Sequence, residues 1–144
     1  MKKLTIFILL FSAFCGLCFA QTVNNVNVTV EINHIVPNGG KVYLVVFFNA
    51  ESFKNEKPDI AIEIPSDKAS VIKEGPLPRG ECVLFVFQDA NHNIKLDTGL
   101  FGIPKEKFGI SNYFGKGIPT RHFDKQKIMI DENTGKIILG LYKF

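Results

Sequence analysis

Seven short apolar segments, separated by turn residues, are the feature that most limits the folds open to this chain of 144 residues. In the first segment, 26–33 (VNVTVEIN), apolar side chains alternate with polar ones. A period of two is typical of a half-buried β-strand, which places one face in a core and the other in water. The segments follow one another at nearly regular intervals without a convincing amphipathic helix. We therefore predict a single antiparallel β-sandwich, immunoglobulin-like or transthyretin-like.

Two of the segments are apolar without interruption, which favours central strands that are covered on both faces. They are 41–49 (KVYLVVFFN) and 82–87 (CVLFVF). The polar segment 50–58 has room for one helical turn. Turns are expected at 37–40, 65–67 and 76–80, and a hairpin turn at 132–135 (ENTG). The seven expected strands are 26–33, 41–49, 60–64, 69–73, 82–87, 123–131 and 136–144.

The first twenty residues have the composition of a secretory signal peptide. Lys2 and Lys3 precede the apolar run 4–14, and small residues, Cys18 and Ala20, stand at the cleavage-recognition positions. An uncleaved anchor is the alternative, but the run is shorter than the roughly 20 residues that a spanning helix needs. We predict a signal peptide at 1–20 and a single domain at 21–144, without a transmembrane segment after cleavage. The expected location is periplasmic or secreted.

Removal of this leader changes what charge and cysteine content indicate. The chain has 17 basic and 14 acidic residues, and the leader holds two of the basic ones and none of the acidic ones, so the mature charge is 15 − 14 = +1. A nearly neutral domain lacks the field that nucleic-acid binding requires, so no nucleic-acid partner is expected. Cys82 is left as a single cysteine without an internal disulfide, and we expect it to be a small buried hydrophobe.

The stretch 88–120 has no clear period, and connections longer than about 15 residues in compact domains are usually functional or disordered. Its aromatic residues Phe101, Phe108, Tyr113 and Phe114 argue against disorder, because they need burial or a partner. We expect a folded loop at one end of the sandwich, acting as a ligand-binding surface for an envelope or extracellular partner. Its glycine turns are expected at Gly99, Gly102, Gly109, Gly115 and Gly117, and its ligand-binding residues are predicted to be Phe101, Glu106, Ser111, Asn112 and Tyr113.

The start of this loop has the spacing of a calcium-binding loop. Oxygen ligands stand at relative positions 1, 3, 5 and 9, with a backbone carbonyl at 7, because alternate residues of a curling backbone aim their oxygens at one point. Position 6 holds Ile94 instead of glycine and position 12 holds Leu100 instead of glutamate, although Glu106 could reach in from later in the loop. The alternative is that these side chains cap turns by bonding backbone amides. The predicted Ca²⁺ ligands are Asp89, Asn91, Asn93, Lys95 and Asp97.

Support for catalysis is weaker. The histidines have no metal-ligand spacing, there is no Gly-x-Ser-x-Gly elbow, and the glycines do not form a phosphate-binding loop. A small periplasmic hydrolase that uses His92, Asp97 or Ser111 is the alternative to a non-enzymatic binding or structural module. A third possibility is an envelope component that docks through its strand edges or through Phe144.

The same loop resembles a bacterial exported family catalogued as domain of unknown function 2141. The resemblance implies a periplasmic or secreted β-sandwich of a Gram-negative bacterium and supplies no activity. This chain departs from the family's pattern at Ile94, where glycine is typical, at Gly99, where asparagine is typical, and at Glu81-Cys82, where a tyrosine usually follows the glycine. The matching residues are Asp89-x-Asn91-x-Asn93-x-Lys95-Leu96-Asp97-Thr98, Phe101-Gly102-Ile103-Pro104-Lys105-Glu106 and Gly109-Ile110-Ser111-Asn112.

Overall fold

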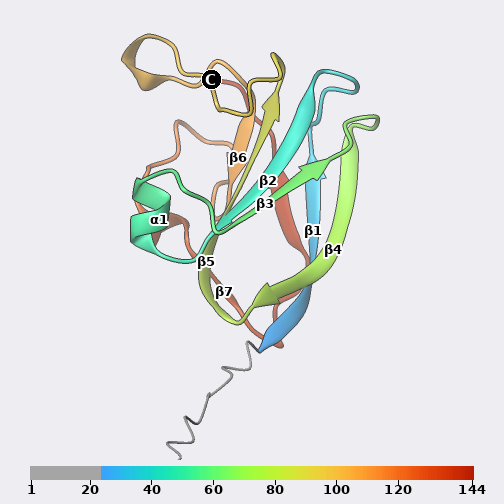
Figure 1. The fold of residues 1–144 in the computed structure, drawn as a ribbon, viewed down its shortest axis with the longest axis vertical. Helices are drawn as coiled ribbons and strands as arrows, with labels where there is room; N and C mark the ends of the chain where they lie inside the picture. Colours follow the sequence, from blue (N-terminus) through green and yellow to red (C-terminus); the bar gives the residue numbers. More distant parts are fainter. Residues whose placement is uncertain (1–23) are drawn as a thin grey trace, which may run out of the picture.

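Two packed β-sheets make up the fold in the computed structural model, which describes residues 24–144 except for the side chain of Phe101 (Figure 1). The described residues form eight strands, and all but one of their pairings are antiparallel. This confirms the predicted all-β sandwich, with one strand more than expected. The predicted signal peptide, 1–20, lies outside the described residues.

The smaller sheet has three strands in the order β4-β1-β8. In its centre, β1 shows the predicted alternation, with Val28, Val30 and Ile32 buried, Val26 packed against the same core, and the alternate side chains facing outward. β1 pairs antiparallel with β4 but parallel with β8. The predicted turn at 76–80 is wrong in part: β4 continues to Pro78, since an edge strand tolerates proline on its free side. The strands are β1 (Asn25–Asn33), β4 (Ser70–Pro78) and β8 (Ile137–Gly140).

The larger sheet has five strands, and its two central strands, β2 and β5, are buried on both faces as predicted. β6 and β7 share one side of β5: β7 pairs with the start of β5 at 80–82 and β6 with its later part at 85–87. Cys82, on β5, is fully buried, and its burial raises the pKa of the thiol to about 12, which agrees with the expected inert hydrophobe. The strands are β2 (Lys41–Phe47), β3 (Ile60–Ile64), β5 (Gly80–Asp89), β6 (Phe108–Ile110) and β7 (Ile128–Ile130).

Two sequence predictions near the C-terminus need correction. The expected strand 123–131 begins as the short helix α2 (Phe123–Gln126), and only Ile128–Ile130 is a strand. The expected hairpin turn at 132–135 does not join paired strands, because β7 belongs to the larger sheet and β8 to the smaller one. This turn therefore carries the chain from one sheet to the other.

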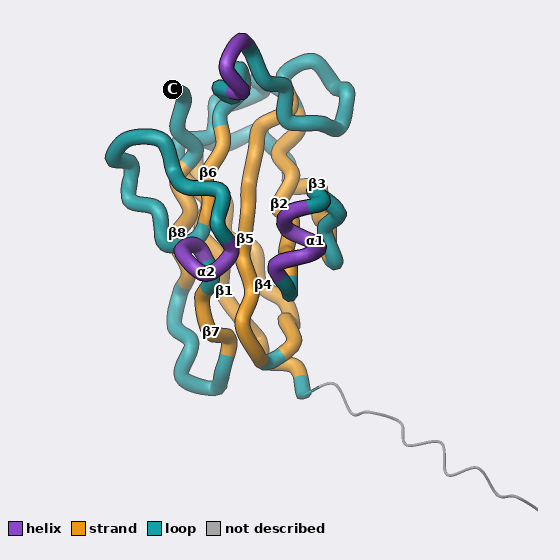
Figure 2. The backbone as a smooth tube through the Cα atoms, turned by 90° about the vertical axis from the view of Figure 1, so that its left-hand side faces the viewer, coloured by secondary structure: helices purple, strands orange, loops and turns teal. Residues whose placement is uncertain are grey.

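The outer face of the larger sheet is apolar, unlike that of the smaller sheet. Val45, Phe47, Val83 and Ile110 form a second buried cluster outside the main core. The short helix α1 (Ala50–Lys54), at the predicted helical turn, adds Phe53 to this cluster, and α2 adds Phe123. Figure 2 shows both helices on the near side of this sheet, α1 beside β2 and α2 on the opposite side of β5.

Candidate binding site in the 88–120 segment

The predicted loop 88–120 is two connections rather than one. Gln88 and Asp89 end β5, and β6 (Phe108–Ile110) interrupts the expected loop by pairing with β5 and, through Phe108, with Tyr142. Gly109 lies inside β6 rather than in a turn. A Cβ atom at this position would stand 2.2 Å from the carbonyl oxygen of Gly140, so the close approach of β6 to β8 requires glycine. The connections that remain are 90–107 and 111–122.

Asp89 anchors the first connection although none of its surface is exposed. Its carboxylate oxygens accept hydrogen bonds from the backbone N–H of Asn93 at 3.2 Å and of Ile94 at 2.8 Å. The buried charge is thereby compensated by backbone donors, which is the usual condition for burying a carboxylate. The chain turns so sharply around it that His92 and Ile94 both have a φ of 61°, in the left-handed region.

The other predicted metal ligands gather beside Asp89. The Asn91 and Asn93 side-chain amides both donate to the carboxylate of Asp97, with Asn93 Nδ2 at 3.0 and 3.1 Å from its two oxygens. The Oδ1 atom of Asn93 accepts the backbone N–H of Lys95 at 2.9 Å. The structure thus brings the five predicted residues into one turn, in which side chains cap backbone amides. Among residues 24–144, no group of three His, Cys, Asp or Glu side chains is arranged to hold a metal ion.

Glu106 ties the two ends of this turn together through backbone amides, a role that differs from the metal ligand considered from the sequence. Only 8% of its surface is exposed. Its Oε1 accepts the N–H of Ala90 at 2.8 Å and its Oε2 the N–H of Asp97 at 3.2 Å. This carboxylate therefore fixes the position at which the chain leaves the turn at Asp97.

Residues 97–105 project from this base as a narrow hairpin, here called the finger. The N–H of Lys105 donates to the carbonyl of Asp97 at 2.7 Å, and Thr98 bridges Pro104. The N–H of Gly99 donates to the carbonyl of Ile103 at 2.7 Å. At its tip lies a 3-10 turn, η1 (Leu100–Gly102), which is the gold turn at the upper left of Figure 1.

The finger tip is apolar and faces water. Leu100 is 84% exposed and Ile103 is 39% exposed, while Ile94 in the neighbouring turn is 69% exposed. Phe101 also belongs to η1, but its side chain lies outside the described part of the structure. In Figures 1 and 2 the finger stands at the same end of the molecule as the C-terminus.

The second connection begins with Ser111, which has a structural role. The residue is 2% exposed, and its hydroxyl donates to the carbonyl of Gln126 at 2.5 Å and accepts the N–H of Leu84 at 3.1 Å. Its proton thus bonds a backbone carbonyl rather than an imidazole. Asn112, with a φ of 58°, donates to the carbonyl of Lys127 at 2.7 Å. Both residues attach the second connection to α2 and the segment after it.

Tyr113 joins this connection to the C-terminal residues through aromatic contacts. Its ring lies edge-on to Tyr142 at 5.6 Å and tilted to Phe144 at 5.9 Å, while its hydroxyl donates to the carbonyl of Gly117. Burial raises the pKa of its phenol above the usual range. The ring of Phe108 extends this aromatic cluster, because its centroid lies 5.1 Å from that of Phe144. The predicted ligand-binding residues therefore do not converge, because Glu106 serves the first connection while Ser111, Asn112 and Tyr113 serve the second.

Two glutamines were missed from sequence. Gln88 accepts the N–H of Val36 at 2.9 Å and donates to its carbonyl at 2.8 Å, which ties the end of β5 to the connection after β1. Gln126 donates to the carbonyl of Thr120, and its buried Oε1 has no hydrogen-bond partner in the described structure. The only sequence signal for the role of Gln88 was that this polar residue directly follows an apolar strand. No sequence signal indicated the role of Gln126.

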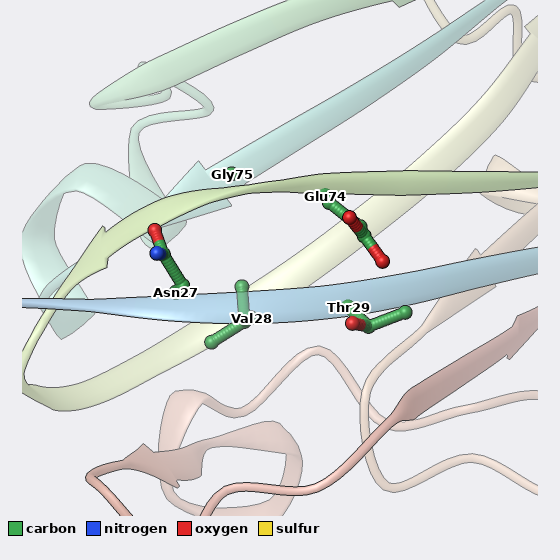
Figure 3. Close-up of a pocket in the computed structure, with 5 residues that line it drawn as sticks. All are labelled: Asn27, Val28, Thr29, Glu74 and Gly75. Atoms are coloured by element: carbon green, nitrogen blue, oxygen red, sulfur yellow. The ribbon is translucent and has the colours of Figure 1, made fainter.

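Two shallow grooves lie away from the turn and the finger. One of ≈ 360 Å³ is on the outer face of the smaller sheet, where Asn27 and Glu74 flank the backbone of β1 and β4 (Figure 3). The other, of ≈ 480 Å³, runs between β7 and β8 and includes Ser111, Asn112 and Phe114 in its lining. No residue of the turn or the finger lines either groove.

Fold and segment together define a β-sandwich with a built-in polar turn and a projecting finger. Residues 30–138 match the family model described as "Uncharacterized protein conserved in bacteria (DUF2141)". Because the match covers more than half of the chain, the protein belongs to this family. No curated protein and no solved structure matches it. Neither α1 nor α2, nor any other helix within residues 24–144, has the length and apolar character needed to cross a bilayer.

Proposed function

We propose that this protein is a non-enzymatic binding module that acts through the 88–120 segment on a component of the bacterial envelope or its surroundings. One observation carries the proposal. Ten large apolar side chains are exposed among the described residues, and five of them lie in this segment of 33 residues. Clustered apolar exposure marks interaction sites in folded proteins. The five are Ile94, Leu100, Ile103, Phe114 and Ile118.

The test compares the retention of the purified protein on isolated bacterial envelopes. Replacing Leu100 and Phe114, which are 84% and 85% exposed, by serine removes the most exposed apolar side chains of the segment. The matched control replaces Ile72 and Ile138, which are 56% and 63% exposed on the smaller sheet. The proposal expects the first variant to lose retention and the control to keep it. Equal retention of both variants would contradict it.

We further propose that Ca²⁺ orders the first connection. The donors would be the carboxylates of Asp89 and Asp97, the amide oxygens of Asn91 and Asn93, and the Lys95 carbonyl. Carboxylate, amide and carbonyl oxygens are the ligands that Ca²⁺ takes. The mutual hydrogen bonds of the Asn91, Asn93 and Asp97 side chains support the proposal, because they show that these three side chains lie close enough together to contact one ion.

Calcium binding is tested by thermal unfolding with Ca²⁺ and with a chelator, since a ligand that binds only the folded state raises its midpoint. The expected result is a higher midpoint with Ca²⁺ that is lost in Asp97→Asn. The control is Asp67→Asn, at an exposed carboxylate outside the turn, which should keep the shift. A midpoint that is identical under both conditions in the unaltered protein would refute the calcium proposal and leave the binding proposal intact.

Export to the periplasm or beyond is also proposed, from the sequence of residues 1–20. Cell fractionation with N-terminal sequencing tests it directly. The expected protein lies outside the cytoplasm and begins at Gln21, whereas a cytoplasmic protein that begins at Met1 would refute export.

A further inference from the structure

The finger is stiff at its base and apolar at its tip. Its two sides are held together by backbone hydrogen bonds between residues 97 and 105 and between residues 99 and 103. The bridge between Thr98 and Pro104 adds a further link. The Glu106 carboxylate fixes its first residue by accepting the N–H of Asp97. Leu100 and Ile103 are therefore presented to solvent by a braced element rather than by a loose loop, which lowers the entropic cost of binding.

Exposed lysines stand at the base of the finger. They are Lys95 and Lys105, whereas Lys107, which precedes β6, is half-buried and donates from its Nζ to the carbonyl of His34 at 2.8 Å. The side chain of Lys105 runs along the finger, since a Cβ atom added at Gly99 would lie 3.4 Å from its Cε. The nearby carboxylates are less exposed than these two lysines: Asp89 and Glu106 are buried, and Asp97 is half-buried. The exposed charged side chains at the base of the finger are therefore both cationic.

We propose that the finger docks on the surface of a bilayer containing anionic phospholipid, with Leu100 and Ile103 among the acyl chains and Lys95 and Lys105 at the headgroups. This inference rests on the proposed function and names the partner of the same segment. An apolar projection with cations at its base gains both from burial at the bilayer interface and from attraction to anionic lipid. Long lysine side chains reach the headgroups while their methylene stems lie along apolar surface.

The shape of the site selects a bilayer over a small ligand. Finger residues line neither of the two grooves described above, whereas the finger itself projects from the end of the sandwich. A projecting tip needs a partner that it can enter, and positive charge at the base of the finger complements a surface of phosphate groups. Anionic lipid satisfies both requirements.

The experiment is co-sedimentation with two sets of lipid vesicles. The protein is purified as the cells produce it, with whatever N-terminus it then has. One set contains equal parts of phosphatidylglycerol and phosphatidylcholine, and the other contains phosphatidylcholine alone. The protein should sediment with the first set at low salt, less at high salt, and not with the second set. Leu100→Ser should weaken binding by about tenfold or more, from the lost burial of one leucine side chain. The control Ile72→Ser should bind as the unaltered chain does.

A second variant tests the charge contribution. Lys95→Gln with Lys105→Gln should weaken binding by roughly tenfold or more, because each lysine near an anionic surface contributes about a fivefold increase in affinity. The control, Lys68→Gln with Lys73→Gln, removes the same charge from exposed positions outside the finger and should change binding little.

Three outcomes would overturn the proposal: no binding to anionic vesicles, unchanged binding of Leu100→Ser, or an equal loss in both lysine pairs, which would indicate non-specific attraction. Retention on envelopes without vesicle binding would refute the lipid partner and leave the proposed function standing, with a protein or polysaccharide as its partner. Loss of both would refute the two together.

Discussion

The outer faces of the two sheets differ sharply. On the smaller sheet, alternate residues of β1 such as Asn27 turn toward water, and its outer surface carries only a shallow groove. On the larger sheet, the outward side chains of β2 and β5, such as Val45 and Phe87, are as buried as the core side chains behind them. Among the central strands, alternating polarity therefore marks the uncovered sheet and an uninterrupted apolar run marks the covered one, whereas the edge strand β3 alternates although it belongs to the covered sheet.

The covered face is also the one around which the candidate site is built. α1 and α2 lie over it, and the first connection adds Leu96 to its aromatic cluster. The finger follows the turn at the end of β5, one of the two central strands of this sheet. The long connections therefore bury some of their apolar side chains against the larger sheet. They expose other apolar side chains, such as Leu100, to solvent at the end of that sheet. The predictions below compare matched positions on the two sheets.

The largest expected effect is at Phe87, which is 7% exposed and stacks on Tyr43 at 5.4 Å. Phe87→Ala should lower the free energy of unfolding by about 3–5 kcal/mol, as for other buried phenylalanines. Asn27→Ala, on the outward side of β1, should change it by less than about 0.5 kcal/mol. Urea denaturation measures both. Similar losses at the two positions would show that the outer faces are equivalent.

Gly109→Ala should be the next most damaging change. The new methyl group would overlap the Gly140 carbonyl, 2.2 Å away, and force β6 from β8 at a cost of about 2–3 kcal/mol. On the smaller sheet, a Cβ atom at Gly75 would meet nothing within 4 Å, so Gly75→Ala should be neutral or stabilising by up to about 1 kcal/mol. Thermal unfolding distinguishes the two, and a neutral Gly109→Ala would mean that β6 and β8 do not approach as described.

Ser111→Ala should cost about 1–3 kcal/mol, because it leaves the buried N–H of Leu84 without its hydroxyl acceptor. The matched change is Ser70→Ala, whose exposed hydroxyl bonds Asn33 on the smaller sheet and should contribute less than about 0.5 kcal/mol. Chemical denaturation gives both values. An unaltered stability of Ser111→Ala, combined with loss of a hydrolytic activity, would favour the enzyme alternative instead.

The smallest expected effect is a gain. Ile94 adopts a φ of 61°, which is costly for a β-branched residue, and its side chain is 69% exposed. Ile94→Gly should therefore stabilise the protein by about 1 kcal/mol. Ile72→Gly, in β4 of the smaller sheet, should instead destabilise it by roughly the same amount. A loss of stability in Ile94→Gly would show that the turn around Asp89 is not the one described.

Sequence patterns were sufficient where the decisive interactions are local. Alternation located β1, and uninterrupted apolar runs located β2 and β5. β6 was missed because it has three residues and a central glycine, and its pairing depends on β5, which lies far from it in the chain. The parallel pairing of β1 with β8 joins the two ends of the domain, and no local pattern reports such a contact.

The candidate site was predictable to a similar degree. The spacing of Asp89, Asn91 and Asn93 predicted calcium ligands, with capping of backbone amides as the alternative, and the hydrogen bonds display the capping. The structural roles of Glu106 and Ser111 were not predictable. Their backbone partners stand 16 and 27 residues away at Ala90 and Leu84, where folding rather than spacing decides the contact.

The most direct test of the account is hydrogen exchange of the backbone amides with and without anionic vesicles. In the free protein, the amides of Ile94, Asp97 and Lys105 should exchange slowly, since Asp89, Glu106 and the Asp97 carbonyl accept their hydrogen bonds. Vesicles should then slow exchange across η1 and leave β4 unchanged. Fast exchange at the base of the finger, or vesicle protection on β4 instead of η1, would contradict a braced finger that carries the binding surface.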